Sequence, residues 1–410
     1  MKAIPLRVPL GLSLTLLLLS IFGCGSAGTQ PGQFQVTTTA APNVQSVTVN
    51  SGPSSILGPG SNYVDGAFTS VTVCTPGSTT NCQTIDGILV DTGSSGLRIL
   101  SSALSVTLPQ QTDSSSNPIA ECAAFADGIT WGPVQTADVK MAGELASSLP
   151  IQVIGSLNFP TVPADCASQG PAEDDLVSLG ANGLLGVGSS IEDCGPDCAT
   201  TGPFSQGAYY SCPTTGCVDT TEGLAQQVQN PVAAFATDNN GVILELPAVT
   251  GEEGSVNGAL IFGIGTQANN GLGSATVFGT DSLGNFTTIF KSTRYSTFLD
   301  SGSNAIYFLD ATTTGIPVCN DISFLYCPAT AQKISVTNDG TNGASGSVTF
   351  TVANADLLLS NPASAAINGL AGPNSLGGFD FGLPFFFGLN VYTAFDGKAT
   401  PAGTGPYIAY

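Results

Sequence analysis

Two short segments each place an acid at the end of an apolar run and follow it with a turn of small residues. They are ILVDTGSSGLRIL, with Asp91, and TFLDSGSNAIYFL, with Asp300. One such turn alone is ordinary, because hydroxyl and backbone N–H groups commonly bind a nearby carboxylate. The apolar flanks, however, predict that both acids are buried. A buried carboxylate is costly unless it is well hydrogen-bonded or shares a proton.

Two carboxyl groups in contact would solve this problem together and would also provide chemistry. One member keeps a proton and the other stays ionised, so that the pair is a general acid and a general base at once. Such a pair can activate a water molecule for direct attack on a peptide carbonyl. The chain contains no His, so a serine triad would lack its usual base. We expect no metal and no cofactor.

The elements around the two turns are predicted to be mostly β. Among 410 residues 51 are Gly, and short apolar runs are separated by Gly, Asn and Pro about every ten residues. Each half of the chain has a strand, the acidic turn, another strand and later an apolar segment containing Gly, at 182–188 and 379–388. This order indicates duplication and predicts two related β lobes around a cleft. Helix is expected only in short pieces, best at 223–232 and at 355–361.

The chain divides into four predicted parts. Residues 1–23 are typical of a lipoprotein signal peptide, with Lys2 and Arg7 before an apolar run, although a plain secretory signal is an alternative. Cys24 would then carry a lipid that attaches an exported protein to the membrane of the cell envelope. Residues 24–60 are predicted to be a flexible tether containing one possible strand at NVQSVTVN. The two lobes are expected at 61–250 and 251–410.

Cysteine content and charge limit the remaining possibilities. Ten cysteines besides Cys24 form an even set, which in an exported chain indicates disulfides. Their spacing makes Cys74–Cys82, Cys212–Cys217 and Cys319–Cys327 plausible pairs without fixing the connectivity, and the segment 194–217 is expected to be an insertion. The net charge of −21 with only eight basic residues argues against nucleic acid as a partner.

The two Asp-Thr/Ser-Gly-Ser turns resemble the active-site turns of the pepsin-like aspartic proteases, a bilobal β family with one catalytic Asp in each lobe. The similarity extends, in order, to NGLLGVG at 182–188, to NPVAAFATDNNGVILELP and GSVNGALIFGIGTQ, and to NVYTAFDGK and GPYIAY near the end. It covers most of the chain after about residue 60. The C-terminal detail looks closest to a branch of uncharacterised bacterial exported proteins.

The resemblance implies a role for each residue of the turns. Asp91 and Asp300 would form the catalytic pair. Thr92 and Ser301 would cross-bond the two loops. The glycines would let backbone N–H groups approach the carboxylates, and the following serines would bond their outer oxygens; these supporting residues are Gly93, Ser94, Gly302 and Ser303.

The chain departs from the family pattern in places. The β-hairpin flap that usually closes the cleft is placed at 123–143, with Phe125 where the family carries Tyr, and with Asp127, Gly128 and Trp131 as further flap or cleft residues. Phe125 could shield the site but could not donate a hydrogen bond. For Trp131 a core position is favoured over a role in the cleft, because buried aromatics are commoner than functional ones. The second-lobe strand FDFGLPFF lacks the acid that commonly follows its Gly, and Arg98 is expected at the surface or at the edge of the cleft.

These patterns favour an exported, monomeric endopeptidase that binds extended polypeptides between its lobes. One alternative is a weakly active or inactive protein of the same fold that binds or inhibits a partner at the cell surface. A β-rich adhesive protein with two purely structural turns is a further alternative. It would leave the ordered resemblance of both halves unexplained.

Overall fold

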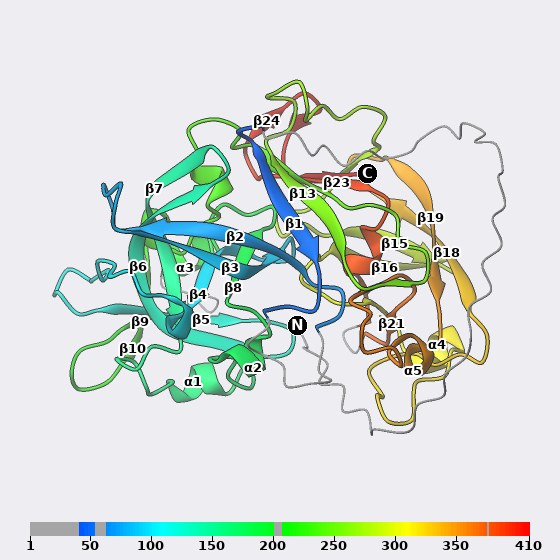
Figure 1. The fold of residues 1–410 in the computed structure, drawn as a ribbon, viewed down its shortest axis with the longest axis horizontal. Coiled ribbons are helices and arrows are strands. Elements are labelled where there is room, and N and C mark those ends of the chain that lie inside the picture. Colours follow the sequence, from blue (N-terminus) through cyan, green and yellow to red (C-terminus); the bar gives the residue numbers. More distant parts are fainter. Residues whose placement is uncertain (1–40, 54–62, 201–206, 375–376) are drawn as a thin grey trace, which may run out of the picture.

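The computed structural model describes residues 41–53, 63–200, 207–374 and 377–410. These residues form two β lobes on either side of a central sheet, as Figure 1 shows. The mostly β, bilobal fold predicted from the sequence is therefore confirmed. The predicted signal peptide with Cys24 and the tether residues 24–40 and 54–60 lie outside the described residues. No helix among the residues described is both long and apolar enough to span a membrane.

The possible strand predicted at NVQSVTVN is confirmed as β1 (Val44–Val49), so the assignment of these residues to a flexible tether is wrong. All six residues pair with β13 (Val256–Phe262) in an antiparallel ladder. Val47 and Val49 are buried, whereas Ser46 and Thr48 are not. The alternation of NVQSVTVN therefore reflects a strand with one face in the core. The segment is part of the central sheet.

The first lobe is built mainly from antiparallel strands, with parallel pairings of β3 with β8 and of β4 with β7. Strand β8 pairs in parallel with β3, placing Gly186 beside Asp91, and pairs antiparallel with β4 on its other side. The segment NGLLGVG thus passes directly behind the first acidic turn, as predicted. The strands are β2 (Ala67–Cys74), β3 (Cys82–Asp91), β4 (Ser95–Leu100), β5 (Ile119–Ala124), β6 (Ile129–Met141), β7 (Glu144–Ile154), β8 (Gly183–Val187), β9 (Tyr209–Ser211) and β10 (Val218–Thr220).

The second lobe repeats this arrangement around its own acidic turn. Strand β22 pairs in parallel with β16 and antiparallel with β17, so that it lies between the two strands that flank Asp300. A Cβ at Gly382, directly after β22, would lie 2.1 Å from the Ala305 carbonyl oxygen, and therefore this position requires Gly. The strands are β15 (Phe286–Phe290), β16 (Thr293–Leu299), β17 (Ile306–Phe308), β18 (Gln332–Asp339), β19 (Ser345–Val352), β21 (Ala371–Gly372) and β22 (Phe379–Phe381).

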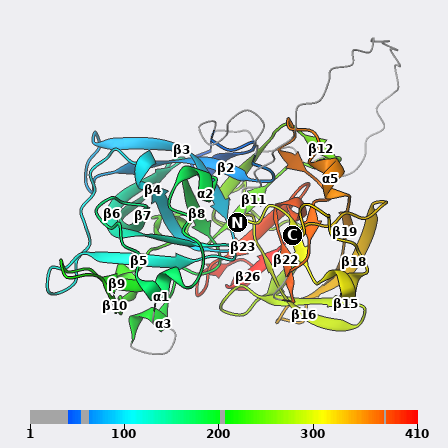
Figure 2. The ribbon, with the colours of Figure 1, turned by 90° about the horizontal axis from the view of Figure 1, so that it is seen from below.

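A central sheet joins the lobes. Its hydrogen-bonded order is β1, β13, β11, β23, β26 and β14, and it continues into the first lobe through β2. Figure 2 shows β11, β23 and β26 between the two lobes. Because strands from both halves of the chain alternate in this sheet, it positions one lobe relative to the other. The additional bounds are β11 (Gly241–Glu245), β14 (Val277–Gly279), β23 (Asn390–Ala394) and β26 (Tyr407–Ala409).

Helices and small strand pairs occupy the connections. The α-helices are α1 (Ala164–Ala167), α2 (Leu176–Leu179), α3 (Pro196–Ala199), α4 (Ala311–Thr314) and α5 (Ala355–Leu358). The 3-10 helices are η1 (Ser101–Ala103), η2 (Leu224–Gln226), η3 (Val232–Ala234) and η4 (Leu383–Phe385). The strand pairs are β12 (Glu252–Glu253) with β20 (Ala366–Ile367), and β24 (Ala399–Thr400) with β25 (Gly403–Thr404).

The helix predicted at 355–361 is confirmed in its first turn by α5, but the one predicted at 223–232 is wrong. Only the short η2 and η3 lie there, separated by extended backbone that begins at Gln227. The buried Gln227 side chain donates to the carbonyl oxygens of Gly195 and Glu222, which holds it out of a helix. Pro231 further disfavours helical backbone at the residue before it.

Five disulfides link cysteines among the described residues. They include the three pairs that spacing made plausible: Cys74–Cys82, Cys212–Cys217 and Cys319–Cys327. The remaining four cysteines pair as Cys122–Cys166 and Cys194–Cys198. Spacing therefore predicted three of the close pairs, whereas Cys194–Cys198, four residues apart, and Cys122–Cys166, 44 residues apart, were not predicted.

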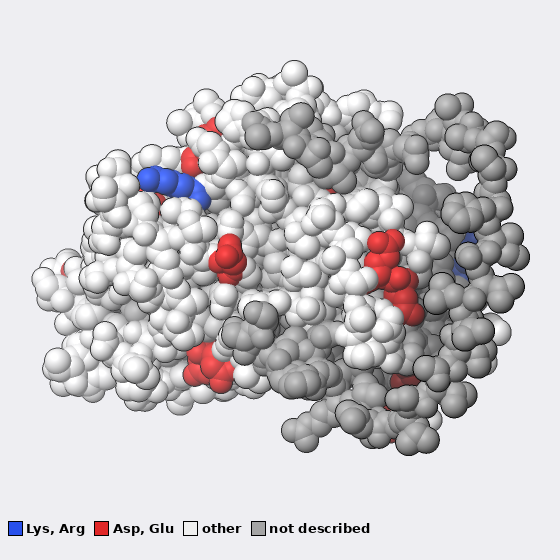
Figure 3. Space-filling view, in the orientation of Figure 1, with Lys and Arg blue, Asp and Glu red and all other residues white. Residues whose placement is uncertain are grey.

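Charged side chains are sparse on the surface. On the face drawn in Figure 3, acidic and basic residues form a few separate patches within a largely uncharged area. This agrees with a charged-residue content of 9%. Several acids are instead buried inside the molecule, among them Asp65, Asp91, Glu121 and Asp380.

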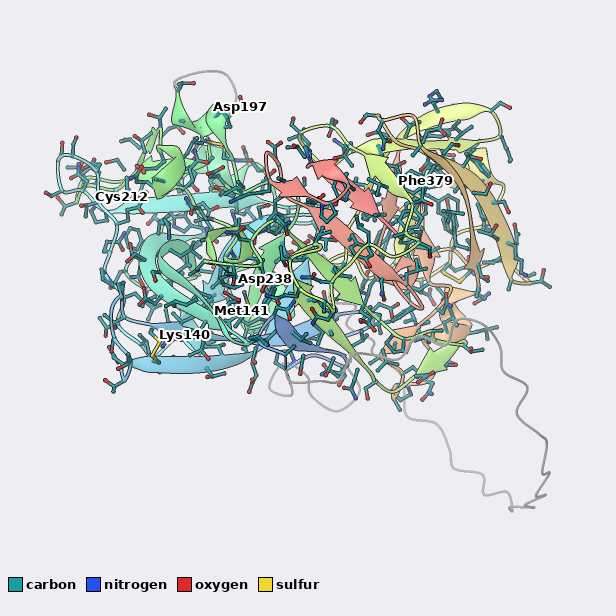
Figure 4. All side chains as sticks on the ribbon, turned by 90° about the horizontal axis from the view of Figure 1, so that it is seen from above. Lys140, Met141, Asp197, Cys212, Asp238 and Phe379 are labelled. Carbon is teal, nitrogen blue, oxygen red and sulfur yellow. A yellow bond between two sulfur atoms is a disulfide. The ribbon has the colours of Figure 1, made fainter. Side chains whose placement is uncertain are left out.

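Aromatic packing dominates the core of the second lobe. Phe379, labelled in Figure 4, is fully buried and stacks on Phe308 with ring centroids 5.5 Å apart. It also contacts Phe381 and Phe290. Since Phe379 and Phe381 flank Asp380 on β22, they fix the strand that lies behind the second acidic turn.

We expect Phe379→Ala to lower the free energy of unfolding by about 3–5 kcal/mol, because it removes a buried ring and leaves a cavity. Phe379→Leu keeps most of the volume and should cost clearly less. Urea unfolding followed by circular dichroism measures both. Equal losses in the two variants would contradict this account of the aromatic core.

Candidate active site

The first acidic turn holds its carboxylate with two donors. Asp91 is the last residue of β3 and is completely buried. The Gly93 backbone N–H donates to Asp91 Oδ1 at 2.8 Å, and the Ser94 hydroxyl donates to Asp91 Oδ2 at 2.5 Å. The turn itself therefore supplies one hydrogen-bond donor to each carboxyl oxygen of Asp91.

The second turn repeats this arrangement on the other lobe. Asp300 follows β16, and its Oδ1 accepts from the Gly302 backbone N–H at 2.8 Å. Its Oδ2 accepts from the Ser303 hydroxyl at 2.8 Å. The residues predicted to support the two acids are therefore brought together in the predicted pattern.

The two acids meet across the lobe junction. The two carboxyls interact directly, and a side-chain hydrogen bond between them is one of the causes that raise the pKa of Asp91. A Cβ at Gly93 would lie 2.6 Å from Asp300 Cγ, so only Gly allows this approach. Burial, then the charge on Asp300, raises the pKa of Asp91 well above its usual range. One proton is consequently retained by the pair where isolated carboxyls would be ionised.

Cross-bonds between the turns hold the acids in place. The Thr92 backbone N–H donates to Ser301 Oγ at 3.1 Å, and the Ser301 backbone N–H donates to Thr92 Oγ1 at 2.9 Å. Each hydroxyl also donates to the opposite lobe, Thr92 to the Leu299 carbonyl and Ser301 to the Val90 carbonyl. All these groups are buried. The reciprocal set fixes the distance between the two carboxyls.

A cavity of about 360 Å³ borders the first acidic turn, although neither Asp91 nor Asp300 is among its lining residues. Gly93 and Ser94 form one part of its lining, and Leu283, Phe298 and Leu299 of the second lobe form another. Leu283 is 76% exposed although it is a large apolar residue. The cavity therefore combines polar groups of the first acidic turn with an apolar wall from the second lobe.

The predicted flap is a β-hairpin formed by β5 and β6. Its turn closes through the Phe125 backbone N–H, which donates to the Gly128 carbonyl at 2.8 Å. Gly128 is buried against the segment 171–173, where a Cβ would lie 2.7 Å from both Glu173 Cγ and the Pro171 carbonyl oxygen. The backbone N–H of Ile129 also donates to Pro171. The hairpin is thus packed onto a neighbouring loop.

Phe125 is half-buried, and a cation lies near its ring. The Arg98 guanidinium carbon is 5.7 Å from the ring centroid, within the range of a cation–π contact. The side chain also packs on the cluster that contains Tyr63 and Leu100. The aromatic residue of the flap is therefore positioned by a charge and by apolar contacts, without a hydroxyl of its own.

Acidic groups flank the flap turn. Burial, and then the charge on Asp127, raises the pKa of Glu173 to about 7. Asp127 and Asp300 both also contribute to raising the pKa of Tyr63 and of Tyr307. The charges of Asp127 and Asp300 therefore act on the same two tyrosines.

Trp131 is a core residue, so its assignment to the flap or cleft is wrong. It is 3% exposed, its indole N–H donates to the Phe159 carbonyl at 3.0 Å, and it contacts Tyr210 edge to face. The buried position follows from its place on β6, opposite Cys122 of the Cys122–Cys166 disulfide.

The expectation that Arg98 lies at the surface is also wrong. Its side chain is buried and forms ion pairs with Glu121 at 2.5 Å and Asp193 at 3.0 Å. Asp193 also accepts from the Tyr209 hydroxyl and lines the cavity that borders the first acidic turn. The partners come from β5 and from the segment before the cysteine-rich insertion, neither of which is close to Arg98 in the sequence.

A third acid, Asp380, also reaches the second turn. Its Oδ2 lies 2.7 Å from Ser303 Oγ, the same hydroxyl that bonds Asp300. The sequence pattern pointed to the position after Gly382, which is Leu383, and missed this carboxyl two residues before the Gly. An acid between two Phe residues in a buried strand was the available signal.

The comparisons with known proteins agree with this geometry at the level of fold. A sequence model of the family described as "Protein of unknown function (DUF3443)" matches residues 39–410. The chain belongs to this family. No curated protein is significantly similar to it.

One similar solved structure is an aspartic proteinase from Irpex lacteus. The match has a TM-score of 0.53 and 14% sequence identity, and it covers 89% of this chain and 96% of that chain. At this identity the likeness establishes the pepsin-like bilobal fold of the DUF3443 chain and leaves its activity to be argued from the site.

The buried acids predict that the folded state is more stable at acidic pH than at neutral pH. Burial raises the pKa of Glu173 and of Glu222 to about 7, and raises that of Asp65 above its usual range. Unfolded carboxyls titrate near about 4. The folded state thus binds more protons between about pH 4 and 7, and stability is lost as the pH rises through that window.

We therefore expect the melting temperature to rise as the pH falls from about 8 to about 5, measured by circular dichroism. The double variant Glu173→Gln with Glu222→Gln should show a shallower rise, because two of the titrating groups are gone. A melting temperature that is highest near pH 8 would refute the assignment.

Proposed function

We propose that this protein is an aspartic endopeptidase that hydrolyses peptide bonds with Asp91 and Asp300. The observation that carries the proposal is a pair of carboxyls, Asp91 fully buried and Asp300 partly buried, that come from opposite lobes, approach each other closely and are held by matching donors. A structural turn needs no partner carboxyl on the opposite lobe. Bringing two acids together is unfavourable unless their shared proton is used or strongly bound.

The chemistry follows from one proton shared by two acids. The ionised carboxylate takes a proton from a water molecule as the water oxygen bonds to the peptide carbon, and the protonated carboxyl gives its proton to the carbonyl oxygen. The tetrahedral intermediate then loses the hydroxyl proton, and the C–N bond breaks as the nitrogen gains a proton. The products are a carboxylic acid and an amine, and the pair again holds one proton.

The surroundings of the pair support a polypeptide substrate. The cavity beside Gly93 and Ser94 is open and is walled by Leu283 and Phe298, which suits apolar side chains of an extended chain. The flap hairpin carries Phe125, a ring that could exclude water from the reacting bond. Gly128 lets the flap pack closely on its neighbouring loop.

We further propose that the protein acts outside the cytoplasm, attached by a lipid on Cys24. Support comes from the signal-like residues 1–23 and from the five disulfides, which persist in oxidising compartments. The enzyme would then meet its substrates in the cell envelope.

Asp91→Asn and Asp300→Asn should each lower hydrolysis of an unfolded protein at acid pH by at least about 100-fold, because each removes one proton-transfer group. Initial rates measured with the purified soluble part of the protein, from about pH 3 to 7, provide the test.

The matched control is Asp197→Asn, an exposed acid remote from the pair in sequence, which should keep the full rate. Equal rates in the wild type and both dyad variants would exclude the proposed chemistry. An intact fold with no hydrolysis at any pH, together with tight binding of a protein partner, would favour the binding-protein alternative.

Cys24→Ser should abolish incorporation of a labelled fatty acid and release the protein from the membrane fraction, because the thioether to the lipid cannot form. Cell fractionation with metabolic labelling measures this. Unchanged labelling and membrane association would contradict a lipid anchor at this residue.

A further inference from the structure

The Ser303 hydroxyl lies between two carboxyl groups. Its oxygen is 2.8 Å from Asp300 Oδ2 and 2.7 Å from Asp380 Oδ2. A hydroxyl carries one proton and therefore donates to only one of these oxygens. The other short contact needs a second proton, since two oxygens at this distance without a hydrogen between them repel each other. One of the two carboxyls must be the donor to Ser303.

Asp380 is the carboxyl better placed to carry that proton. It is 7% exposed, and its Oδ1 has no hydrogen-bond partner among the described residues. Asp300, by contrast, has a contact at each oxygen, the Gly302 backbone N–H at Oδ1 and Ser303 Oγ at Oδ2. A buried carboxyl with one unbonded oxygen is most stable when neutral.

The groups facing Asp380 strengthen this assignment. Burial, followed by the charge on Asp300 and later that on Asp91, raises the pKa of Asp380 well above its usual range. Tyr307 of β17 is paired with Asp380 in the ladder, and its hydroxyl donates to Asn304. Its own pKa is raised, first by burial and then by the charge on Asp380, so it remains neutral.

The first lobe has Leu184, and not a carboxyl, at the position equivalent to Asp380. Strand register identifies the equivalents: Asp380 pairs in parallel with Phe298, two residues before Asp300, and Leu184 pairs in parallel with Leu89, two residues before Asp91. Leu184 is fully buried and cannot hydrogen-bond Ser94. The duplicated site is thus asymmetric at this one position.

We propose that Asp380 is a positioning residue that, when protonated, donates to Ser303 and so commits the Ser303 proton to Asp300. The inference rests on the proposed function and assigns the roles within it. A donor that is itself hydrogen-bonded donates more strongly, so Asp300 is kept ionised. The shared proton then lies on Asp91. Asp300 is the general base that activates water, and Asp91 is the general acid.

Kinetics of two substitutions at Asp380 test this relay, in which Asp380 donates to Ser303 and Ser303 donates to Asp300. Asp380→Asn can place an N–H where the carboxyl O–H was, and should keep kcat within about twofold. Asp380→Leu removes the donor; it should lower kcat about tenfold with little change in KM, and should move the acidic limb of the pH profile to higher pH, because Asp300 is then less readily ionised.

Ser303→Ala should move the acidic limb in the same direction and further, because it removes the direct donor to Asp300. Asp65→Asn is the matched control: Asp65 is another buried acid, but it bonds the backbone of Ile367 instead of a catalytic turn. It should leave the acidic limb in place. Equal profiles for the wild type and Asp380→Leu would overturn the proposal.

A measurement independent of hydrolysis keeps the inference separate from the proposed activity. The infrared difference between the wild type and Asp380→Asn at about pH 6 should contain the carbonyl band of a protonated carboxyl, well above the ordinary ionisation range of Asp. This holds even if the protein proves inactive. Absence of that band would show that Asp380 is ionised and would refute the relay.

Discussion

Two acids that share a proton across the junction of the lobes are the constraint on which the site depends. Asp91 is fully buried and Asp300 partly buried, so Asp91 could not stay ionised at low cost without donors and a partner. The cross-bonds between Thr92 and Ser301 keep the two turns at a fixed separation. Gly93 leaves the space into which Asp300 fits. The central sheet then holds the lobes so that these contacts can form at all.

The same local solution is built twice. In both lobes a strand carrying a Gly passes between the two strands that flank the acidic turn, β8 in the first lobe and β22 in the second. Close backbone approach at these glycines excludes larger side chains. The duplication explains why the donors to Asp91 and Asp300 match. It also makes the difference between Asp380 and Leu184 at equivalent positions chemically meaningful.

Phe125 of the flap is held by a buried cation and by apolar contacts, because it has no hydroxyl that could form a hydrogen bond. Arg98 is buried beside Phe125 and is neutralised by Glu121 and Asp193. Breaking one member of such a buried ion pair leaves an uncompensated charge, which is strongly unfavourable. The ion cluster therefore ties the first strand after Asp91, the flap strand β5 and the start of the cysteine-rich insertion into one unit.

Local patterns in the sequence determined the β class, the two acidic turns with their donors, and the close disulfides. In each case the interacting residues lie within a few positions, so composition, alternation and spacing carry the information. Contacts between distant segments were decided only by the tertiary structure. The burial of Arg98, the core position of Trp131 and the approach of Asp380 to Ser303 depend on which strands lie side by side. The alternation within a strand shows which of its faces is buried, but it does not show which distant strand lies beside it. Several strands of the chain could pair with the same segment equally well.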